Sequence, residues 1–388
     1  MNLIIFVALY VVSVAYLTFR NFQYPICGDR EGEYNVFGSM IGENVCVEEI
    51  LKYCPLVTAP PYILWRLFKV PAFTAFRITP AFFHALLPAF MFLIAREWFD
   101  VGYSLLAVFL VISNFFFMCY TDTGRMGIAI GLLAGALWGI VTGNVLVSIF
   151  FLALLLLAHY GTAQYTLFVL GASWLTGLLT SGSSLTITYA VYISMLWFWQ
   201  NILCKVVGKM SASFLESAVR SDLITPSLSG KQGFLAPRVA WLSFDGRDPM
   251  LKSAFGFTWN SMKLPQKLEL ITSWLITIMV SASVVYAMRQ GVTVPSLLGL
   301  WAFVAIVIAV VVPYISRYYG VIRTYTTSML FLTPLVIRLI ADYQLGWIVL
   351  GILIVHSLLV AGVPHYLWGL DKYKAARLHV ANRYGEVS

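Results

Sequence analysis

Three carboxylates stand close together in the polar segment that follows the first apolar run of the sequence. Asp29, Glu31 and Glu33 occupy alternate positions within residues 26–40. A carboxylate beside a low-dielectric region has a raised proton affinity, which suits a general base that deprotonates a hydroxyl group. Carboxylates in such a group are also the ligands that a divalent cation prefers. A solvated polar loop is the alternative interpretation, and the segment alone leaves both open.

Asp122 and Arg125 form a second charged group, in the short segment 120–125 between two apolar runs. Asp122 is either a helix N-cap or a carboxylate that acts together with Asp29. Arg125 is either part of a solvated turn or a group that holds an anionic part of a substrate.

Two more polar turns carry candidate substrate-binding residues. They are His159 and Tyr160 in the first turn, and Arg317, Tyr318 and Arg323 in the second. A guanidinium group matches the geometry of a phosphate group, and an arginine at membrane depth tends to be paired or functional. The alternatives are His and Tyr as interfacial anchors, and Arg side chains that reach lipid headgroups.

The elements that must position these residues are membrane-spanning helices. The chain has 388 residues, of which 60% are hydrophobic and only 11% are charged. A soluble domain has about 25% charged residues, and apolar runs of about 20 residues are typical of membrane spans. The runs are continuous rather than alternating, which favours helices over a closed barrel. The sequence therefore predicts an all-α, polytopic transmembrane bundle.

About eleven spans are expected, and the first apolar run is one of them because it lacks the basic start and cleavage site of a signal peptide. The expected spans are 2–19, 79–95, 101–119, 125–141, 144–158, 163–180, 184–204, 268–288, 294–314, 325–341 and 345–363. The chain then divides into a membrane module (1–204, with a long first loop at 20–78), a polar loop (205–266), a second group of spans (267–364) and a basic tail (365–388). Within the first loop, Pro60 and Pro61 are expected to break any helix.

Alternation of the spans places the polar turns on one face. That face collects the Asp29 loop, 120–125, 159–164, 205–266 and 316–325, whereas the other face has only tight connections. The net charge of +8 fits topology or lipid phosphate better than nucleic acid, which is not an expected partner. Cys27, Cys46 and Cys54 lie in the first loop and could include one disulfide in an oxidising compartment, but their spacing does not match a zinc site.

Four segments, in this order, resemble the GT-C superfamily of multipass glycosyltransferases. This superfamily includes the catalytic subunits of oligosaccharyltransferase, the protein O-mannosyltransferases and the lipid A aminoarabinose transferases. The segments are GDREGEY at 28–34, APPYIL at 59–64, FRITP at 76–80 and IAREWF at 94–99. The sequence is most similar to an archaeal branch of the superfamily, in which Asp29, Glu33 and Tyr34 match an acidic motif. The turn 159–165 and Arg317–Tyr319 also look like that branch, with Ala158 and Gly161 departing from its pattern.

The resemblance implies a sugar donor carried on polyprenyl (dolichyl-type) phosphate, and an extracytoplasmic acceptor that is a protein, lipid or glycan. It implies that Asp29, with Glu33 and Asp122, is catalytic and activates the acceptor. Arg317 or Arg323 would take the leaving phosphate, and Arg125, His159, Tyr160 and Tyr318 would contact the substrate. Some relatives require Mg²⁺ or Mn²⁺, for which Asp29 and Asp122 are the candidate ligands.

Three questions stay open in the sequence. A count of Lys and Arg in short loops places the polar face on the cytoplasmic side of the membrane, whereas the resemblance places it on the extracytoplasmic side. Members of the archaeal branch often carry a soluble C-terminal domain, so a partner subunit that recognises the acceptor is expected here. The alternatives to an active transferase are an inactive scaffold subunit and a lipid or sugar transporter, which would need polar residues in the middle of its spans.

Overall fold

A computed structural model of the chain describes residues 2–23, 34, 37–38, 41, 55–113, 117, 124–180, 185–198, 260, 264–311 and 321–360. This part of the chain is helical and contains no β-strand, which confirms the all-α class. The helices are α1 (Asn2–Gln23), α4 (Pro55–Phe68), α5 (Ala72–His84), α6 (Leu86–Arg96), α7 (Val101–Ile112), α9 (Gly124–Val141), α10 (Val145–Ala158), α11 (Tyr160–Thr180), α12 (Leu185–Phe198), α17 (Leu264–Gln290), α18 (Val294–Val311), α20 (Val321–Asp342) and α21 (Gly346–Val360).

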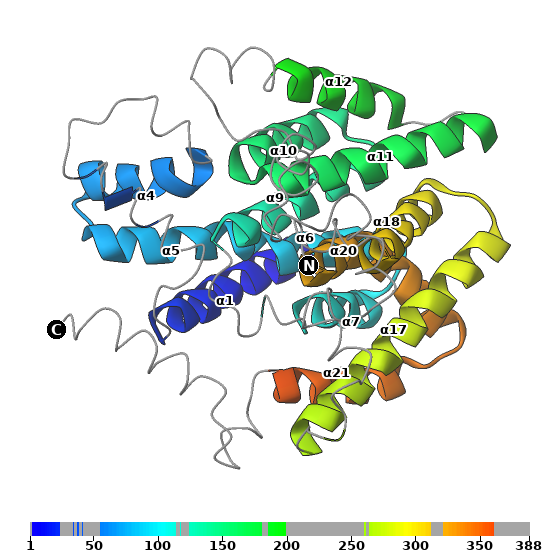
Figure 1. The fold of residues 1–388 in the computed structure, drawn as a ribbon. Helices are drawn as coiled ribbons and strands as arrows, with labels where there is room; N and C mark the ends of the chain where they lie inside the picture. The colour runs from blue at the N-terminus through cyan, green and yellow to red at the C-terminus, as the bar shows by residue number, and fades with distance from the viewer. Residues whose placement is uncertain are drawn as a thin grey trace, which may run out of the picture.

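Five of the described helical segments are long and apolar enough to cross a bilayer, and the protein is therefore membrane-embedded. They are Asn2–Phe22, Ala72–Arg96, Gly124–Val141, Lys267–Gln290 and Arg323–Asp342. Shorter apolar helices lie among them, and α1 stands at the edge of the bundle with only 11% of its apolar window buried (Figure 1). The helices α9 and α20 are central, with about four fifths of each window buried.

The expectation that Pro60 and Pro61 break any helix is wrong. Helix α4 runs through both prolines, although each lacks the N–H group that would bond the carbonyl four residues earlier. The helix packs on α5 and buries Val57, Thr58 and Pro61, so burial of this face outweighs the lost backbone bonds. Much of the expected first loop is consequently helical.

The second expected span also begins earlier than predicted. Helix α5 starts at Ala72 instead of 79, and a break at Ala85 separates it from α6. Pro88 explains the break, because it has no N–H to donate to the carbonyl of His84. Arg77 thus lies inside a helix rather than at its entrance.

A row of glycines brings neighbouring helices against α9. These glycines recur at every fourth position: Gly127, Gly131, Gly135 and Gly139. A Cβ atom on Gly131 would lie 1.9 Å from the carbonyl oxygen of Phe83 in α5, and one on Gly135 would lie 2.8 Å from the ring of Phe151 in α10. Small residues at this spacing let membrane helices approach closely, and α9 packs in this way on α5 and α10.

Two of the helices that follow the tight connections, α7 and α10, have a polar N-cap side chain. The Asp100 carboxylate accepts a hydrogen bond from Tyr103 N–H at 2.9 Å, and the Asn144 side chain accepts one from Val147 N–H at 3.2 Å. Each bond satisfies one of the amide groups that have no partner in the first turn of a helix.

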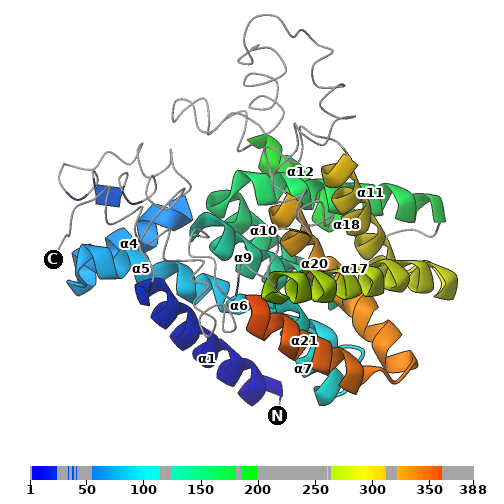
Figure 2. The same cartoon turned by 60° about the horizontal axis from the view of Figure 1, so that its bottom comes forward.

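The described helices give the bundle two distinct ends. We define the turn end by the connections 97–100, 142–144, 291–293 and 343–345, and the polar end by the first residues of α9, α11 and α20 and the last residues of α1. Helix α1 runs antiparallel to α5 and α6, with Phe6 against Phe90 and Asn21 against Arg77. The N-terminus therefore belongs to the turn end, at the lower edge of Figure 2.

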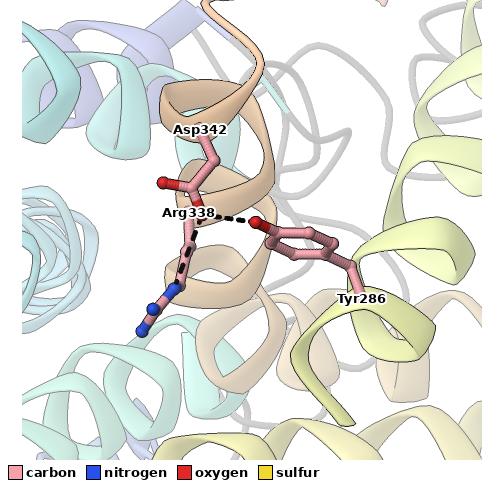
Figure 3. Close-up of polar contacts among 3 residues, drawn as sticks. All are labelled: Tyr286, Arg338 and Asp342. Carbon is pink, nitrogen blue, oxygen red and sulfur yellow. Dashed lines mark hydrogen bonds and ion pairs between the residues drawn. The ribbon is translucent and has the colours of Figure 1, made fainter. Parts of the chain in front are cut away.

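Polar contacts at the turn end join helices that are distant in the sequence. The hydroxyl group of Tyr286 in α17 donates to Asp342 Oδ2 in α20 at 2.8 Å, and Arg338 Nε lies 3.7 Å from the same oxygen (Figure 3). Arg338 and Asp342 are half exposed, and an exposed ion pair of this kind contributes little to stability. We assign these contacts a structural role.

Candidate functional site

The structure brings Arg125, His159 and Arg323 together at the polar end, and we name this group the basic cluster. His159 lies in the turn between α10 and α11 and is 6% exposed. Arg125 is the second residue of α9, Arg323 is the third residue of α20, and the charges of both act on the His159 ring. All three residues are among those that the sequence pointed to as a substrate-binding group.

The imidazole of His159 is neutral at physiological pH. Burial, followed by the positive charges of Arg125 and Arg323, lowers the pKa of His159 to about 3. Burial disfavours the charged form of a histidine, and neighbouring cations disfavour it further. The net charge of the basic cluster at pH 7 therefore comes from its two arginines.

The hydrogen bonds of His159 identify its tautomer. The Thr162 amide N–H donates to His159 Nδ1 at 3.1 Å, and the Thr162 hydroxyl lies 2.8 Å from the same nitrogen. An amide nitrogen can only donate, so Nδ1 carries no hydrogen and the neutral ring has its hydrogen on Nε2. His159 thus acts as the N-cap of α11 through Nδ1 and carries its hydrogen on Nε2.

Three helices begin at the basic cluster. The first residues of α9, α11 and α20 meet there, and α9 contacts both α11 and α20. The N-terminus of a helix carries about half a positive charge and presents amide groups that have no partner within the helix. Arginine side chains and helix N-termini together form an arrangement suited to an anion such as phosphate.

A buried chain of hydrogen bonds holds α11 against α20 next to the basic cluster. The Ser328 hydroxyl donates to the carbonyl oxygen of Ala302 in α18 at 3.0 Å, so its oxygen accepts from the Tyr165 hydroxyl at 2.5 Å. Both side chains are buried, and the chain links three helices. Tyr165 belongs to the turn 159–165, whereas Ser328 was not predicted; its signal is a run of polar residues (324, 326, 327 and 328) at the start of an apolar helix.

The other predicted site residues cannot be placed in this way. Asp29, Glu33, Asp122, Arg317 and Tyr318 lie outside the described residues, and Tyr160 is described only by its backbone at the start of α11. The predicted metal ligands Asp29 and Asp122 are among them, as are the cysteines of the first loop. Within the described ranges, no group of three or more His, Cys, Asp or Glu side chains could hold a metal ion.

Arg77, which lies in one of the family-like segments, has a structural role. Its Nη1 donates to the carbonyl oxygens of Asn21 at 2.9 Å and Phe22 at 3.2 Å, and the Asn21 side chain donates back to the Arg77 carbonyl at 3.0 Å. The guanidinium group also lies 4.3 Å from the centre of the Phe73 ring. A cation on the last carbonyls of a helix stabilises its negative end, so Arg77 fastens the end of α1 to α5.

Phe117 joins the same region to the segment before α9. Its carbonyl oxygen accepts a hydrogen bond from Arg20 Nη1, and its ring stacks on Tyr16 at 6.0 Å and meets His84 edge-on at 5.1 Å. Phe117 is 3% exposed, so α1, α5 and this residue form one packed unit at the polar end.

Comparisons of the chain with protein-family models, with curated proteins and with solved structures found no match. The basic cluster at the N-termini of α9, α11 and α20 is therefore the feature of this chain from which a function can be inferred.

Proposed function

We propose that this protein is a multi-pass glycosyltransferase of the GT-C type, with about eleven spans, that moves a sugar from a polyprenyl-phosphate donor to an extracytoplasmic acceptor. The observation that carries the proposal is the basic cluster of Arg125, His159 and Arg323 at three helix N-termini. These features favour a phosphate ligand, since arginine and helix N-termini are the groups that most often hold one.

The depth of the basic cluster favours a phosphate that is attached to a lipid. Two candidate spans, Gly124–Val141 and Arg323–Asp342, begin at the cluster. If these two helices span the bilayer, the cluster lies where the hydrocarbon region ends, because a span starts at that boundary. A polyprenyl phosphate has its headgroup at this level and its chain in the hydrocarbon, so both parts of such a donor would find a matching environment.

The proposed reaction increases the negative charge on the phosphate. The acceptor oxygen attacks the anomeric carbon of the sugar, the bond from that carbon to the phosphate oxygen breaks, and the bonding electrons leave with the phosphate. The phosphodiester with one negative charge becomes a monoester with two. Arg125 and Arg323 would stabilise the added charge. Asp29 stays the predicted base that takes the acceptor proton.

Two other functions remain as outcomes of the test. An inactive scaffold subunit would bind the lipid phosphate but release no product. A transporter would move the lipid-linked sugar across the bilayer without breaking the bond to phosphate. The bond cleavage itself distinguishes the transferase from both.

The test uses protein reconstituted in liposomes, a panel of polyprenyl-phosphate donors with radiolabelled sugars, and membrane extract as the source of acceptor. We expect release of polyprenyl phosphate with one donor, and a loss of about 10²-fold in Arg323→Gln, as for removal of one donor to a developing oxyanion. Arg289→Gln is the matched control, because Arg289 is exposed at the turn end. Asp29→Asn tests the predicted base, and a chelator tests the predicted metal.

Equal release by the wild type and Arg323→Gln would remove the basic cluster from the mechanism. Donor binding without release would favour the scaffold subunit. Movement of intact donor between leaflets would favour the transporter.

A further inference from the structure

The elbow between α4 and α5, residues 63–73, exposes large apolar side chains. Leu67 and Phe68 are 69% and 68% exposed, and Ile63 and Phe73 are 46% and 42% exposed. Ile63 and Leu67 are four residues apart and share one face of α4, which Phe68 extends. Apolar groups gathered at such a place mark an interaction surface more often than a solvated one.

Two cations stand within the same elbow. Arg66 and Lys69 are exposed, and Lys69 takes a left-handed conformation (φ 56°) where α4 ends and the chain turns towards α5. The Val70 N–H group donates to the carbonyl oxygen of Leu64 at 3.2 Å and closes this turn. Residues 63–73 contain Arg66 and Lys69 and no Asp or Glu, so the charge of this surface is complementary to an anion.

The elbow lies at the level where a candidate span ends. The span of α1 ends at Phe22, and the carbonyls of Asn21 and Phe22 accept hydrogen bonds from Arg77 in α5. Phe73 packs on the guanidinium group of Arg77, one turn earlier in α5. The elbow lies just before Arg77 along the chain. Helices α4 and α5 lie side by side at the outer edge of the bundle (Figure 1).

We propose that this elbow is an interfacial anchor that binds anionic phospholipid. Ile63, Leu67 and Phe68 enter the outer part of the acyl layer, and Arg66 and Lys69 bind lipid phosphates. Apolar and basic side chains on one short helix are typical of segments that lie in the interface. The anchor is separate from the basic cluster and does not depend on the proposed transferase activity.

The first test measures the depth of the elbow in proteoliposomes. Leu67→Cys and Lys69→Cys variants are treated with a charged maleimide, and peptide mass spectrometry resolves the labelled position from the native cysteines. We expect Leu67→Cys to react about 10-fold more slowly than Lys69→Cys, since only the first side chain is buried in the acyl boundary. Equal reactivity in liposomes would overturn the proposal. Protection that disappears as protein is diluted in lipid would also overturn it, because it would indicate a second copy of the chain.

The second test measures the preference for an anionic headgroup. The double variant Arg66→Gln/Lys69→Gln is compared with the wild type and with Arg289→Gln, which removes an exposed arginine at the turn end. We expect phosphatidylglycerol to raise the Tm of the wild type and the control more than phosphatidylcholine does, and this difference to disappear in the double variant. An equal Tm of all three proteins in phosphatidylcholine shows that the double variant is folded. A phosphatidylglycerol effect that survives in the double variant would refute the role of the two cations.

Discussion

The packing of α9 on α5 predicts that Gly131→Ala destabilises the protein. Alanine is the better helix former, so this substitution in an unobstructed helix is expected to stabilise it by about 0.8–1 kcal/mol. At position 131, however, the new Cβ atom would lie 1.9 Å from the carbonyl oxygen of Phe83 and 2.8 Å from its carbonyl carbon. These are backbone atoms, so no side chain can move aside to make room.

The size of the effect follows from the displacement that is needed. Cβ atoms are essentially never found closer than 3.0 Å to another heavy atom, so α5 and α9 must separate by at least 3.0 − 1.9 = 1.1 Å. Overpacking of this kind costs about 1–3 kcal/mol, because well-packed neighbours lose contact along the interface. We therefore expect Gly131→Ala to lower the free energy of unfolding by about 1–3 kcal/mol.

Two other glycines provide controls for this prediction. A Cβ atom on Gly351 in α21 would meet nothing within 4 Å, so Gly351→Ala should be neutral or stabilising. A Cβ atom on Gly127 would lie 3.0 Å from His84 Nδ1, a smaller overlap than at Gly131, so its effect should be intermediate. The assay is denaturant unfolding in mixed micelles. A Gly131→Ala protein as stable as Gly351→Ala would show that α5 and α9 do not approach as described.

Several further predictions concern single side chains. His159→Ala removes the N-cap of α11 and should cost about 0.5–2 kcal/mol, whereas His159→Asn keeps an acceptor and should cost less; equal thermal unfolding of the two variants would contradict the capping role. The pKa of His159 is about 6.5 in the unfolded chain and about 3 in the folded protein, so only the unfolded chain binds a proton there between these two pH values. The free energy of unfolding should therefore fall as the pH is lowered from 6.5 to 3, by up to about 1.4 kcal/mol per pH unit. The drop in Tm between pH 7.5 and pH 5.5 should be smaller in His159→Asn than in the wild type. An equal drop in both proteins would contradict the assignment of this pH dependence to His159. Tyr165→Phe removes the donor to Ser328 and should cost about 1 kcal/mol, measured by unfolding and refuted by a neutral result. Arg77→Gln should cost about 2 kcal/mol or more and expose the end of α1 to proteolysis, and an unchanged cleavage pattern would exclude its capping role.

Composition and apolar runs were enough to predict the helical membrane class and the position of many helices. The run at 144–158, for example, is α10 (Val145–Ala158), because an apolar segment in a bilayer has few alternatives to a helix. Alternation of the helices also placed Arg125, His159 and Arg323 at one end. Their proximity required the packing of α9, α11 and α20, which no local pattern contains.

Other features were missed because they depend on partners that are distant in the sequence. The two prolines in α4 indicate a break by local rules, yet packing on α5 keeps the helix continuous. Arg77 stands in the family-like segment FRITP, but its partners are carbonyl groups 55 and 56 residues earlier. The glycine spacing on α9 was visible in the sequence, although only the structure shows that Gly131 faces the backbone of α5.

Binding of a polyprenyl phosphate to the reconstituted protein is the most direct test of the central claim, that the basic cluster holds a lipid-linked phosphate. The measurement compares a short polyprenyl phosphate with the polyprenol of the same length, in the wild type, Arg125→Gln, Arg323→Gln and the control Arg289→Gln. We expect the phosphate to bind at least about 10-fold more tightly than the alcohol in the wild type and the control, and this preference to be lost in the two cluster variants. Equal binding of phosphate and alcohol, or a preference that survives in both cluster variants, would contradict the claim.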